Sequence, residues 1–390
     1  MSDIAEQYDI SVVLPCLNEA ETLASCIRKA RIGIEGAGAK GEIVIADNGS
    51  TDGSIEIACR SGARLVQIAK RGYGSALQGG IEAARGRWIV MGDADGSYDL
   101  SEVPKFVEKL RQGFALVQGC RLPTGGGKVM PGAMPFLHRW LGNPMFSLMA
   151  GWWFKAPIHD VYCGLRAFTK ELYNSLDQRC TGMEFATEMI VKSSLYGAKI
   201  AEVPITLHRD GRKSNAPHLR TFRDGWRTLR FFLMFSPFWL FLVPGAISVI
   251  LGLVGYALAL PGVIVWGATL DAHTLLFASL AIMCGYQSIL FALFTKMFAI
   301  SEGLLPKDKR LTRLCEVVTL ERALLVAIGA LFVGLSLLLV SVYIWKSKGF
   351  GRLDYRETMR LVIPGSMLAA LGFQTILASF FMSILGLSRK

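Results

Sequence analysis

Four long apolar stretches near the C-terminus constrain most strongly what this chain can fold into. Each has the roughly 20 apolar residues that are needed to cross a hydrocarbon core of about 30 Å. Buried helices of a soluble protein are the alternative, but consecutive runs of this length with so little charge would leave no polar face for water. We therefore predict an integral membrane protein whose transmembrane domain covers residues 237–390, with spans at about 237–260, 275–300, 323–345 and 361–387.

Lys and Arg in the links between these stretches indicate the orientation, because cytoplasmic links are enriched in both residues. The first link has neither residue, whereas the second carries Lys307, Lys309, Arg310, Arg313 and Arg322. The third link departs from this rule, since its basic residues would lie outside if all four stretches cross: Lys346, Lys348, Arg352, Arg356 and Arg360. No apolar segment follows Met1, so we expect the part before residue 237 to lie in the cytosol, at a bacterial inner membrane.

The basic residues also bear on the binding partners. The chain has 42 Lys and Arg against 31 Asp and Glu, a formal net charge of +11. The positive charge peaks just before the first apolar stretch rather than across a separate domain, so nucleic acid is not expected as a partner. Five apolar residues recur there at helical spacing: Leu219, Phe222, Trp226, Leu229 and Leu233. Arginines directly follow four of the positions in this stretch, at 220, 223, 227 and 230. This pattern predicts a basic amphipathic helix over residues 217–236 that lies on anionic lipid; a helix packed on its own domain is the alternative.

Six short apolar runs, separated by helical patterns, predict an α/β domain over residues 1–216. They cover residues 10–14, 43–46, 64–68, 88–91, 116–118 and 200–203. Their apolar character does not alternate, which is typical of strands covered on both faces, so we predict a mainly parallel sheet. In such sheets, ligands bind beyond the carboxyl ends of the strands. Polar residues follow three of the runs: Asn18 and Glu19, Asp47 and Asn48, and Asp93 and Asp95.

The Asp93, Ala94, Asp95 motif directly follows one of these apolar runs. Carboxylates at such a position can bind a hard cation, Mg²⁺ or Mn²⁺, that also bridges phosphates. A solvated turn is the alternative, because Asp, Gly and Ser are turn formers. The turn after the first run lacks the spaced glycines of a dehydrogenase-type dinucleotide fold. A metal or cationic side chains would therefore have to meet the charge of a nucleotide.

Three ordered motifs resemble those of family 2 glycosyltransferases of the GT-A fold: SVVLPCLNE at 11–19, IADNGSTDG at 45–53 and GDADGSYD at 92–99. Over about residues 8–235 the chain is similar to the polyprenyl-phosphate glycosyltransferases, the group that contains dolichyl-phosphate mannose synthase and the bactoprenol glucosyltransferases. The resemblance implies a Rossmann-like GT-A domain and an inverting transfer of a hexosyl group, dependent on Mg²⁺ or Mn²⁺. The donor would be a UDP- or GDP-linked nucleotide sugar and the acceptor a polyprenyl phosphate lipid. The resemblance also admits a homo-oligomer, which some relatives form.

The resemblance implies roles for individual residues on the donor side. Asp93 and Asp95 would bind the metal, and Asp95 would also be catalytic. The donor-binding residues would be Pro15, Leu17, Asn18, Glu19, Asp47, Asn48, Arg71, Gly72, Asp93, Ala94, Arg209 and Arg212. Asn48 stands where the family commonly has Asp, which leaves the nucleoside base open. For Asn18, a helix cap at capping-box spacing from Glu21 is an equal alternative.

The family's Arg-x-Gly-x-Ser-Lys stretch, which closes over the diphosphate, corresponds here to residues 209–215. The match is imperfect, because Asn215 follows Ser214 where Lys is expected. Arg212 or Lys213 would then supply that positive charge.

On the acceptor side, the resemblance assigns the lipid phosphate to Arg121, Arg139 and Arg166. Guanidinium groups suit a phosphate dianion because they can donate two parallel hydrogen bonds. Asp160 begins a segment, residues 160–166, that is similar to the family's Asp-x-x-x-Gly-x-Arg, and it would be catalytic near the acceptor. For the arginines, an exposed surface charge without function is the alternative.

Two other functions are alternatives to transfer of a hexosyl group to a polyprenyl phosphate. A processive polysaccharide synthase has Gln-x-x-Arg-Trp after its catalytic Asp, whereas here Arg139 and Trp140 precede Asp160, and Phe136 replaces the Gln. The second alternative is a non-catalytic sugar-nucleotide sensor or a lipid-sugar translocase with a degenerate transferase domain. The retained acidic residues, including Asp95, argue against degeneracy.

Overall fold

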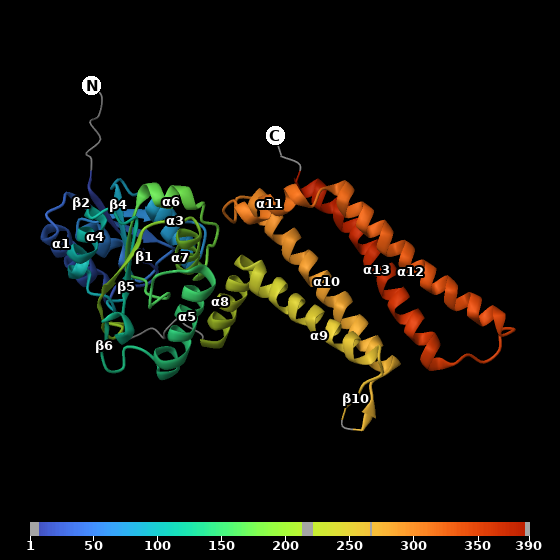
Figure 1. Cartoon of the computed structure of the whole chain (residues 1–390). Helices are drawn as coiled ribbons and strands as arrows, with labels where there is room; N and C mark the ends of the chain where they lie inside the picture. The colour runs from blue at the N-terminus through green and yellow to red at the C-terminus, as the bar shows by residue number, and fades with distance from the viewer. Residues whose placement is uncertain (1–7, 213–220, 266, 387–390) are drawn as a thin grey trace. The chain divides into compact units, whose positions relative to one another are not determined.

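The computed structural model describes residues 8–212, 221–265 and 267–386. Contacts within the chain divide it into two units, Met1–Phe232 and Leu233–Lys390 (Figure 1). The first unit contains the large sheet, and the second consists mainly of long helices.

A mostly parallel sheet forms the core of the first unit, as predicted. Within the described residues it has seven strands in the order β3-β2-β1-β4-β7-β5-β8. Six of them correspond to the predicted runs: β1 (Ile10–Cys16), β2 (Gly41–Asp47), β3 (Arg64–Gln67), β4 (Trp88–Met91), β5 (Leu116–Cys120) and β8 (Ile200–Pro204). The seventh strand, β7 (Arg166–Thr169), was not among the predicted runs. β7 pairs antiparallel with both β4 and β5.

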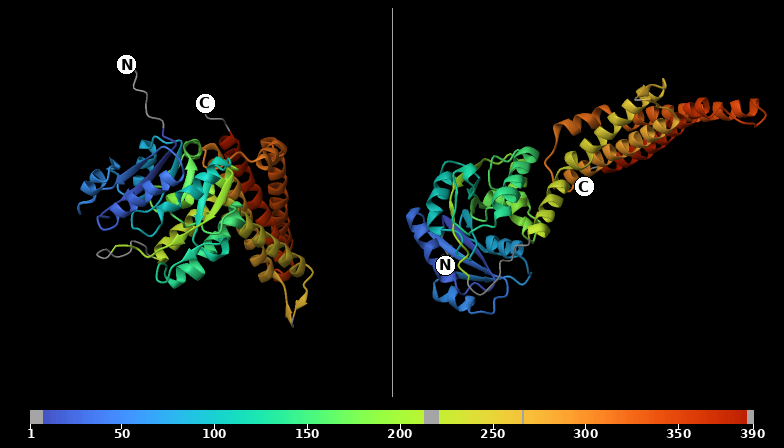
Figure 2. Two further views of the ribbon diagram at one scale, coloured as in Figure 1. Left: turned by 90° about the vertical axis from the view of Figure 1, so that its left-hand side faces the viewer. Right: turned by 90° about the horizontal axis from the view of Figure 1, so that it is seen from below.

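Helices cover both faces of this sheet (Figure 2). α1 (Leu23–Gly36) and α4 (Val103–Arg111) share a hydrophobic core with Val12 and Leu14 of β1. α3 (Tyr73–Ala83) packs on the opposite face, where a Cβ added at Gly80 would lie 2.6 Å from Val13 Cγ1. The other elements of this unit are α2 (Ser54–Arg60), η1 (Leu100–Glu102), η2 (Pro123–Gly125), β6 (Lys128–Val129), η3 (His138–Gly142), α5 (Asn143–Phe154), α6 (Lys170–Leu176), α7 (Glu184–Leu195) and β9 (Thr206–Leu207).

α8 (Thr221–Phe235) lies within the predicted amphipathic segment, of which residues 217–220 lie outside the described residues. The Phe232 ring is fully buried and packs edge-on against Phe146 and Phe154 of α5, with ring centroids 6.1 and 5.2 Å apart. Phe222 and Trp226, in contrast, are exposed. The helix therefore packs on its own domain on one side and presents apolar side chains on another, and its contact with anionic lipid stays a prediction.

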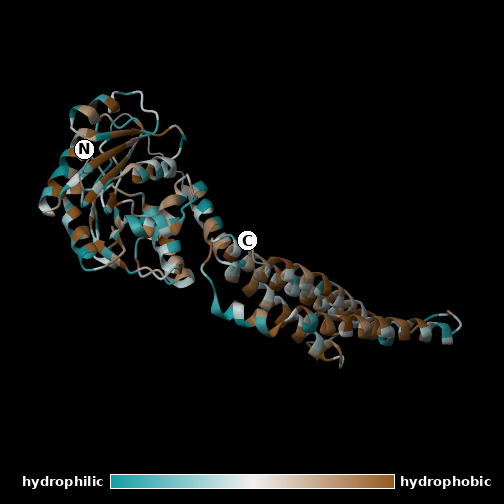
Figure 3. Cartoon of the chain, turned by 90° about the horizontal axis from the view of Figure 1, so that it is seen from above, coloured by the Kyte–Doolittle hydropathy of each residue, from teal (hydrophilic) through white to brown (hydrophobic). Residues whose placement is uncertain are grey.

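Within the described part of the second unit, four helices are long and apolar enough to cross a membrane, as predicted (Figure 3). The first comprises η4 (Phe238–Leu242) and α9 (Val243–Ala259), and the others are α10 (Ala272–Ser301), α12 (Leu320–Ser347) and α13 (Tyr355–Gly386). The links contain α11 (Lys309–Val317) and a small hairpin of β10 (Ile264–Val265) and β11 (Ala268–Thr269).

Glycines bring these long helices together in pairs. A Cβ added at Gly245 of α9 would lie 2.8 Å from the carbonyl oxygen of Gly285 of α10. Gly334 of α12 approaches the carbonyl oxygen of Gly365 of α13 in the same way, at 2.7 Å. Small residues at such contacts are typical of helix packing in membranes, where close backbone approach supplies the attraction. The second unit thus contains two tight helix pairs, α9–α10 and α12–α13.

Candidate active site

The segments that follow β1, β2 and β4 lie at one edge of the sheet, because these strands are parallel neighbours. Asn18 Oδ1 accepts a hydrogen bond from the Thr51 N–H at 2.8 Å, which joins the segments after β1 and β2. The Thr22 hydroxyl donates to the Ala94 carbonyl at 2.6 Å, which joins the segments after β1 and β4. Together these three segments form one polar rim, at the edge where ligands bind in sheets of this kind.

The Asp93 carboxylate is held from two sides. The Tyr73 hydroxyl donates to Asp93 Oδ1 at 2.8 Å. On the other side, a Cβ added at Gly164 would lie 2.7 Å from Asp93 Oδ2, so the close approach requires glycine. Burial, and next the negative charge of Asp95, raise the pKa of Asp93 to about 6. A cation beside this carboxylate would relieve both effects.

Asp95 faces a basic residue that is distant in the sequence. Its Oδ1 accepts hydrogen bonds from the Ser97 N–H and hydroxyl at 2.9 and 2.6 Å. Its Oδ2 lies 3.8 Å from Arg212 Nη2. The Gly211 N–H donates to the Asp95 carbonyl at 2.9 Å and so keeps this segment against the motif. The structure thus brings Arg212 of the predicted donor set beside Asp95.

Arg212 also contacts two further carboxylates. Its Nη1 lies 3.2 Å from Glu19 Oε1, and its Nε donates to both carboxylate oxygens of Asp210 at 3.0 Å. Glu19 is only 8% exposed. This burial raises the pKa of Glu19 to about 7, although the charge of Arg212 acts in the opposite direction.

The raised pKa of Glu19 predicts that the native state loses stability as the pH rises. Its folded pKa of about 7 exceeds the usual 4.5, so folding takes up a proton between these values. The stabilisation is complete below the lower value and is lost as the pH rises through the upper one, up to about 3 kcal/mol. We expect Glu19→Gln to flatten this slope in chemical denaturation of the detergent-solubilised, metal-free protein. The same slope in both proteins would contradict the assignment to Glu19.

Asp47 and Asn48 are buried and shape the loops around the rim. The Asp47 carboxylate accepts hydrogen bonds from two N–H groups of the following turn, at 3.0 and 3.2 Å. The Asn48 Nδ2 donates to the Ile68 and Lys70 carbonyls at 3.0 and 2.9 Å, and its Oδ1 accepts from the Gly72 N–H at 2.8 Å. Since the Asn48 amide is engaged by its own chain, the base contact assigned to Asp47 and Asn48 stays a prediction.

Pro15 lies near the end of β1, and Leu17 and Asn18 lie between β1 and α1. Pro15 is half-buried and Leu17 is exposed. Asn18 has a φ of 60°, and its side chain accepts from Thr51 rather than from the first turn of α1, whose N-cap residue is Thr22. The alternative that Asn18 caps this helix is therefore wrong.

Two arginines of the predicted donor set, Arg71 and Arg209, are exposed. Arg71 precedes Gly72, whose φ of 136° and close approach to the Thr181 carbonyl oxygen both require glycine. Arg209 Nε donates to the Pro131 carbonyl at 2.5 Å. Three residues of the predicted closing stretch lie outside the described residues: Lys213, Ser214 and Asn215.

Asp160 and Arg121 form a buried ion pair. Asp160 Oδ1 accepts from Arg121 Nη2 at 2.9 Å, while Oδ2 accepts from Arg121 Nε and N at 2.7 and 3.0 Å. Such a bidentate pair fixes the orientation of both groups. The Tyr98 hydroxyl lies 3.5 Å from Arg121 Nη1 and accepts from the Gly164 N–H at 2.8 Å. Because Asp160 is fully buried, its evident effect is to orient Arg121.

Arg166 does not lie where an acceptor phosphate could contact it. The side chain is fully buried at the start of β7. Its Nη1 donates to the Ala186 carbonyl and its Nη2 to the Cys163 carbonyl, at 2.5 and 2.7 Å. Burial lowers the pKa of Arg166, as expected for a cation removed from water. The acceptor-phosphate role assigned to Arg166 from the sequence is therefore corrected to a structural one.

η3 and α5 expose an apolar stripe that the sequence analysis missed. Its side chains are three or four positions apart and are between 43% and 74% exposed: Leu137, Leu141, Met145, Leu148 and Trp152. Their helical spacing is the signal that could have revealed them. Arg139 lies on the same segment, half-buried, with its guanidinium 5.3 Å from the Trp140 ring. This arrangement places a cation beside an apolar surface.

The fit of a metal at this site depends on Asp93 and Asp95. Within the ranges that the structure describes, no group of three or more His, Cys, Asp or Glu side chains is arranged to hold a metal ion. Mg²⁺ and Mn²⁺ bound together with phosphates need only one or two carboxylates from the protein. Burial first, and then the negative charge of Asp95, raise the pKa of Asp93, and a cation bound beside the two carboxylates would offset both effects. The two residues therefore fit a divalent cation that shares its coordination with a diphosphate.

Four residues that shape the site have no role among those predicted from the sequence: Thr22, Tyr73, Tyr98 and Gly164. Tyr73 directly follows Arg71 and Gly72 of the predicted donor set, and Gly164 lies inside the segment 160–166, so both lie beside or within recognisable motifs. Tyr98 is the last residue but one of the motif at 92–99, which contains Asp93. Thr22 carries no such signal, because only the folded chain brings its hydroxyl to the Ala94 carbonyl.

Known proteins resemble this chain over both units. Residues 11–176 match the family "Glycosyl transferase family 2", and residues 293–386 match "Glycosyltransferase family 2 C-terminal transmembrane region". The low-salt glycan biosynthesis hexosyltransferase Agl6 of Haloferax volcanii is 35% identical over 387 residues, which are 99% of this chain and 90% of that protein. The dolichyl-phosphate hexose transferase of the same organism is 31% identical over 198 residues, 50% of this chain and 82% of that protein.

Among solved structures, glucosyl-3-phosphoglycerate synthase of Mycobacterium tuberculosis with Mn²⁺, UDP and glucosyl-3-phosphoglycerate is 23% identical. The match covers 58% of this chain and 78% of that one, with a TM-score of 0.45. The same synthase with Mg²⁺ and UDP gives a TM-score of 0.46 at 23% identity, over 58% and 79% of the two chains. At this level of similarity, the ligands of that synthase are not assigned to this chain.

Proposed function

This chain belongs to glycosyltransferase family 2, as a hexosyltransferase with a GT-A domain and a C-terminal transmembrane region, and we propose that it transfers a hexosyl group from a UDP- or GDP-linked sugar to a polyprenyl phosphate. The transfer is metal-dependent and inverts the anomeric centre. The product is a polyprenyl-monophosphate sugar, which serves as a donor for envelope glycoconjugates. The observation that carries this proposal is the Asp93 and Asp95 pair, at a polar rim of a membrane-anchored chain with a dolichyl-phosphate hexose transferase among its relatives.

On the donor side, Asp93 and Asp95 would hold Mg²⁺ or Mn²⁺, and the ion would supply positive charge for a nucleoside diphosphate leaving group. Arg212 adds positive charge on the same side, since its Nη2 already lies 3.8 Å from Asp95 Oδ2. Glu19 holds Arg212 in this position through the contact of 3.2 Å. Glu19 and its neighbours in the predicted donor set line the nucleotide site.

On the acceptor side, Arg121 and Arg139 bind the phosphate of the lipid. A phosphate monoester with its second pKa near 6 is already largely a dianion at neutral pH, so the reaction needs no strong general base. Asp160 therefore acts as a positioning residue, because its buried carboxylate fixes the Arg121 guanidinium. Attack by the phosphate oxygen on the anomeric carbon then depends on alignment of the two anionic reactants.

The lipid tail of the acceptor stays in the bilayer, so the catalytic domain must work at the membrane surface. Two apolar surfaces support this: Phe222 and Trp226 of α8, and the exposed stripe of η3 and α5 that ends at Trp152. Apolar side chains beside cations are typical of helices that lie in the interface. We place residues 1–216 and the helix of 217–236 on the cytosolic side, ahead of the membrane domain of 237–390.

The experiment that tests this function incubates the purified protein in detergent with Mg²⁺ or Mn²⁺, labelled UDP- and GDP-sugars, and a short polyprenyl phosphate. The lipid is then extracted and counted. We expect label from one donor to enter the lipid phase, and addition of EDTA or omission of the lipid to abolish it. Nucleotide binding without transfer from any donor would instead favour a sensor or translocase.

Gly164→Ala is expected to lower the transfer rate by about 100-fold, because small displacements of a reacting constellation have effects of this size. The added Cβ would lie 2.7 Å from Asp93 Oδ2 and 3.2 Å from the Tyr98 hydroxyl, so the carboxylate must move. Initial rates at saturating donor and lipid measure the effect. Gly329→Ala, at a glycine with open space around it, is the matched control. Equal rates for the two variants would refute the close packing of Asp93.

A further inference from the structure

α7 carries an ion pair in the interior of the first unit. Glu188 and Lys192 are one helical turn apart, each 1% exposed, with Lys192 Nζ 2.8 Å from Glu188 Oε1. Removal of two charges from water is costly, and apolar residues of similar size are often as stable in such a place. The pair therefore calls for an explanation other than stability.

Both members of the pair hold the backbone of residues 177–182, here called the 177–182 turn. The Glu188 carboxylate accepts from the Arg179 N–H at 3.1 Å and from the Cys180 N–H at 2.8 Å. Lys192 Nζ donates to the Asp177 carbonyl at 2.6 Å. Asp177 has a φ of 43°, a conformation that costs energy in a residue with a side chain. The ion pair thus supplies the contacts that keep this turn in its shape.

The 177–182 turn also contacts the start of α3 and holds it in place. The Ser75 N–H donates to the Thr181 carbonyl at 3.1 Å. Added Cβ atoms at Gly72 and Gly74 would lie 2.5 Å from the Thr181 oxygen and 2.8 Å from the Cys180 oxygen, so the two backbones are in direct contact. Tyr73 stands between these glycines, and its hydroxyl donates to Asp93 Oδ1 at 2.8 Å.

We propose that Glu188 and Lys192 are positioning residues, which orient the Asp93 carboxylate through the 177–182 turn and Tyr73. The inference rests on the proposed function, in which Asp93 is a metal ligand. Some groups lie outside the coordination shell and orient a side chain that binds the metal. Mutation of such a group typically changes metal affinity by about 10- to 100-fold. Glu188 acts two contacts further out, so the lower end of this range applies.

The test measures binding of Mn²⁺ alone by electron paramagnetic resonance on the full-length protein, in the native chain, Glu188→Gln and Tyr73→Phe. We expect both variants to weaken Mn²⁺ binding by about tenfold. In the double variant, the two effects should not multiply, because both changes interrupt the same path. If Glu188 served folding alone, Glu188→Gln would leave Mn²⁺ binding by the folded protein unchanged.

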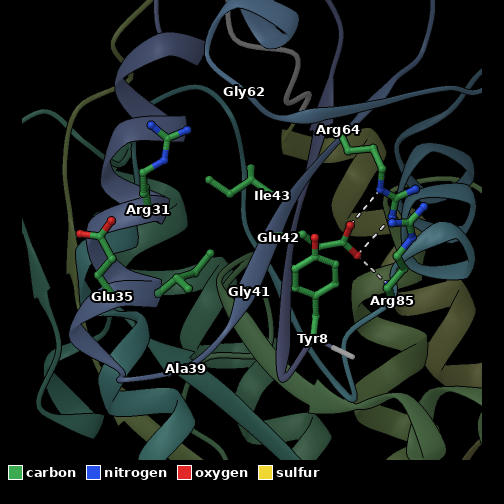
Figure 4. Close-up of a pocket in the computed structure, with 11 residues that line it drawn as sticks. Tyr8, Arg31, Glu35, Ala39, Gly41, Glu42, Ile43, Gly62, Arg64 and Arg85 are labelled. Atoms are coloured by element: carbon green, nitrogen blue, oxygen red, sulfur yellow. Dashed lines mark hydrogen bonds and ion pairs between the residues drawn. The ribbon is translucent and has the colours of Figure 1, made fainter. Parts of the chain in front are cut away.

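Glu42→Gln is the matched control. Glu42 is a half-buried carboxylate that pairs with a cation, Arg64 at 2.8 Å, and accepts from a backbone N–H, that of Arg85 at 2.6 Å (Figure 4). It stands near the start of β2, whereas the polar rim follows the end of that strand. We expect Glu42→Gln to leave Mn²⁺ binding unchanged, whatever its effect on stability. Equal weakening by Glu42→Gln and Glu188→Gln would overturn the inference.

Should Glu188→Gln fail to fold, Glu188→Gln combined with Lys192→Met removes both charges and leaves neither unpaired. The same weakening of Mn²⁺ binding is expected in this pair. Native binding by a folded variant, with Mn²⁺ bound by the native chain, would overturn this inference alone. Absence of Mn²⁺ binding in the native chain would overturn the metal site of the proposed function, and the positioning role with it.

Discussion

Replacement of Asp95 by asparagine is expected to lower the rate of metal-dependent transfer by about two to three orders of magnitude, while the protein stays folded and in the membrane. Asparagine keeps an oxygen that can accept the two hydrogen bonds from Ser97, so the turn is preserved. It lacks the negative charge that a divalent cation requires of its ligand. Initial rates over a range of Mn²⁺ concentrations measure the loss.

Asp99→Asn provides a matched control for this change. Asp99 Oδ1 accepts from the Ser101 N–H and hydroxyl at 3.2 and 2.8 Å, the same arrangement that Asp95 makes with Ser97. If loss of a turn contact explained the effect, both variants would be impaired alike. We expect Asp99→Asn to retain nearly native rates, and Asp95→Asn with native rates would remove Asp95 from the site.

Replacement of Asp160 by alanine is expected to destabilise the protein by about 3 to 5 kcal/mol, because it leaves the Arg121 cation buried without a partner. Asp160 is fully buried, and its two oxygens accept the bidentate bonds of Arg121 at 2.7 and 2.9 Å. Chemical denaturation of the solubilised protein measures the loss. Arg121→Met combined with Asp160→Leu should recover much of the stability, because neither charge is then left unpaired.

The same variants separate a positioning role of Asp160 from a direct catalytic one. Without Asp160 the Arg121 guanidinium loses its orientation, so we expect the KM for the polyprenyl phosphate to rise as well as kcat to fall. The combined variant should stay inactive although it is stable, because Arg121 itself is gone. Asp160→Asn with native stability and native KM but a greatly reduced kcat would point to direct participation instead.

Most of the fold could be predicted because local pattern and long-range pairing agree. Each of the six predicted strands lies in a mostly apolar run, and the four membrane helices are marked by their length and their apolar composition. β7 was not predictable in this way, since its register is set by β4 and β5, which are distant in the sequence. Strand propensity depends on such neighbours more than helix propensity does. α5 was missed because its exposed apolar residues are too few for a membrane span.

The candidate site could be predicted only as far as residue types at the ends of strands. Arg121 and Arg166 look equivalent as potential phosphate ligands, yet Arg166 is buried against the Ala186 and Cys163 carbonyls. Likewise, the amide of Asn48 is engaged by the loop that contains Ile68. Whether a polar side chain faces ligand or its own backbone depends on packing between segments far apart in the chain. A pattern in the sequence does not encode that choice.

α8 ends at Phe235, and only Ser236 and Pro237 separate it from the first membrane helix, which begins at Phe238. In the proposed function, this short link keeps the catalytic domain beside the membrane that holds its lipid acceptor, so their encounter would be a search in two dimensions. Confinement to one membrane would raise the effective concentration of the acceptor, as linkage does for two joined binding modules. A modest intrinsic affinity of the arginines for the lipid phosphate would then be enough for occupancy. It would also let the glycosylated lipid dissociate quickly after each turnover.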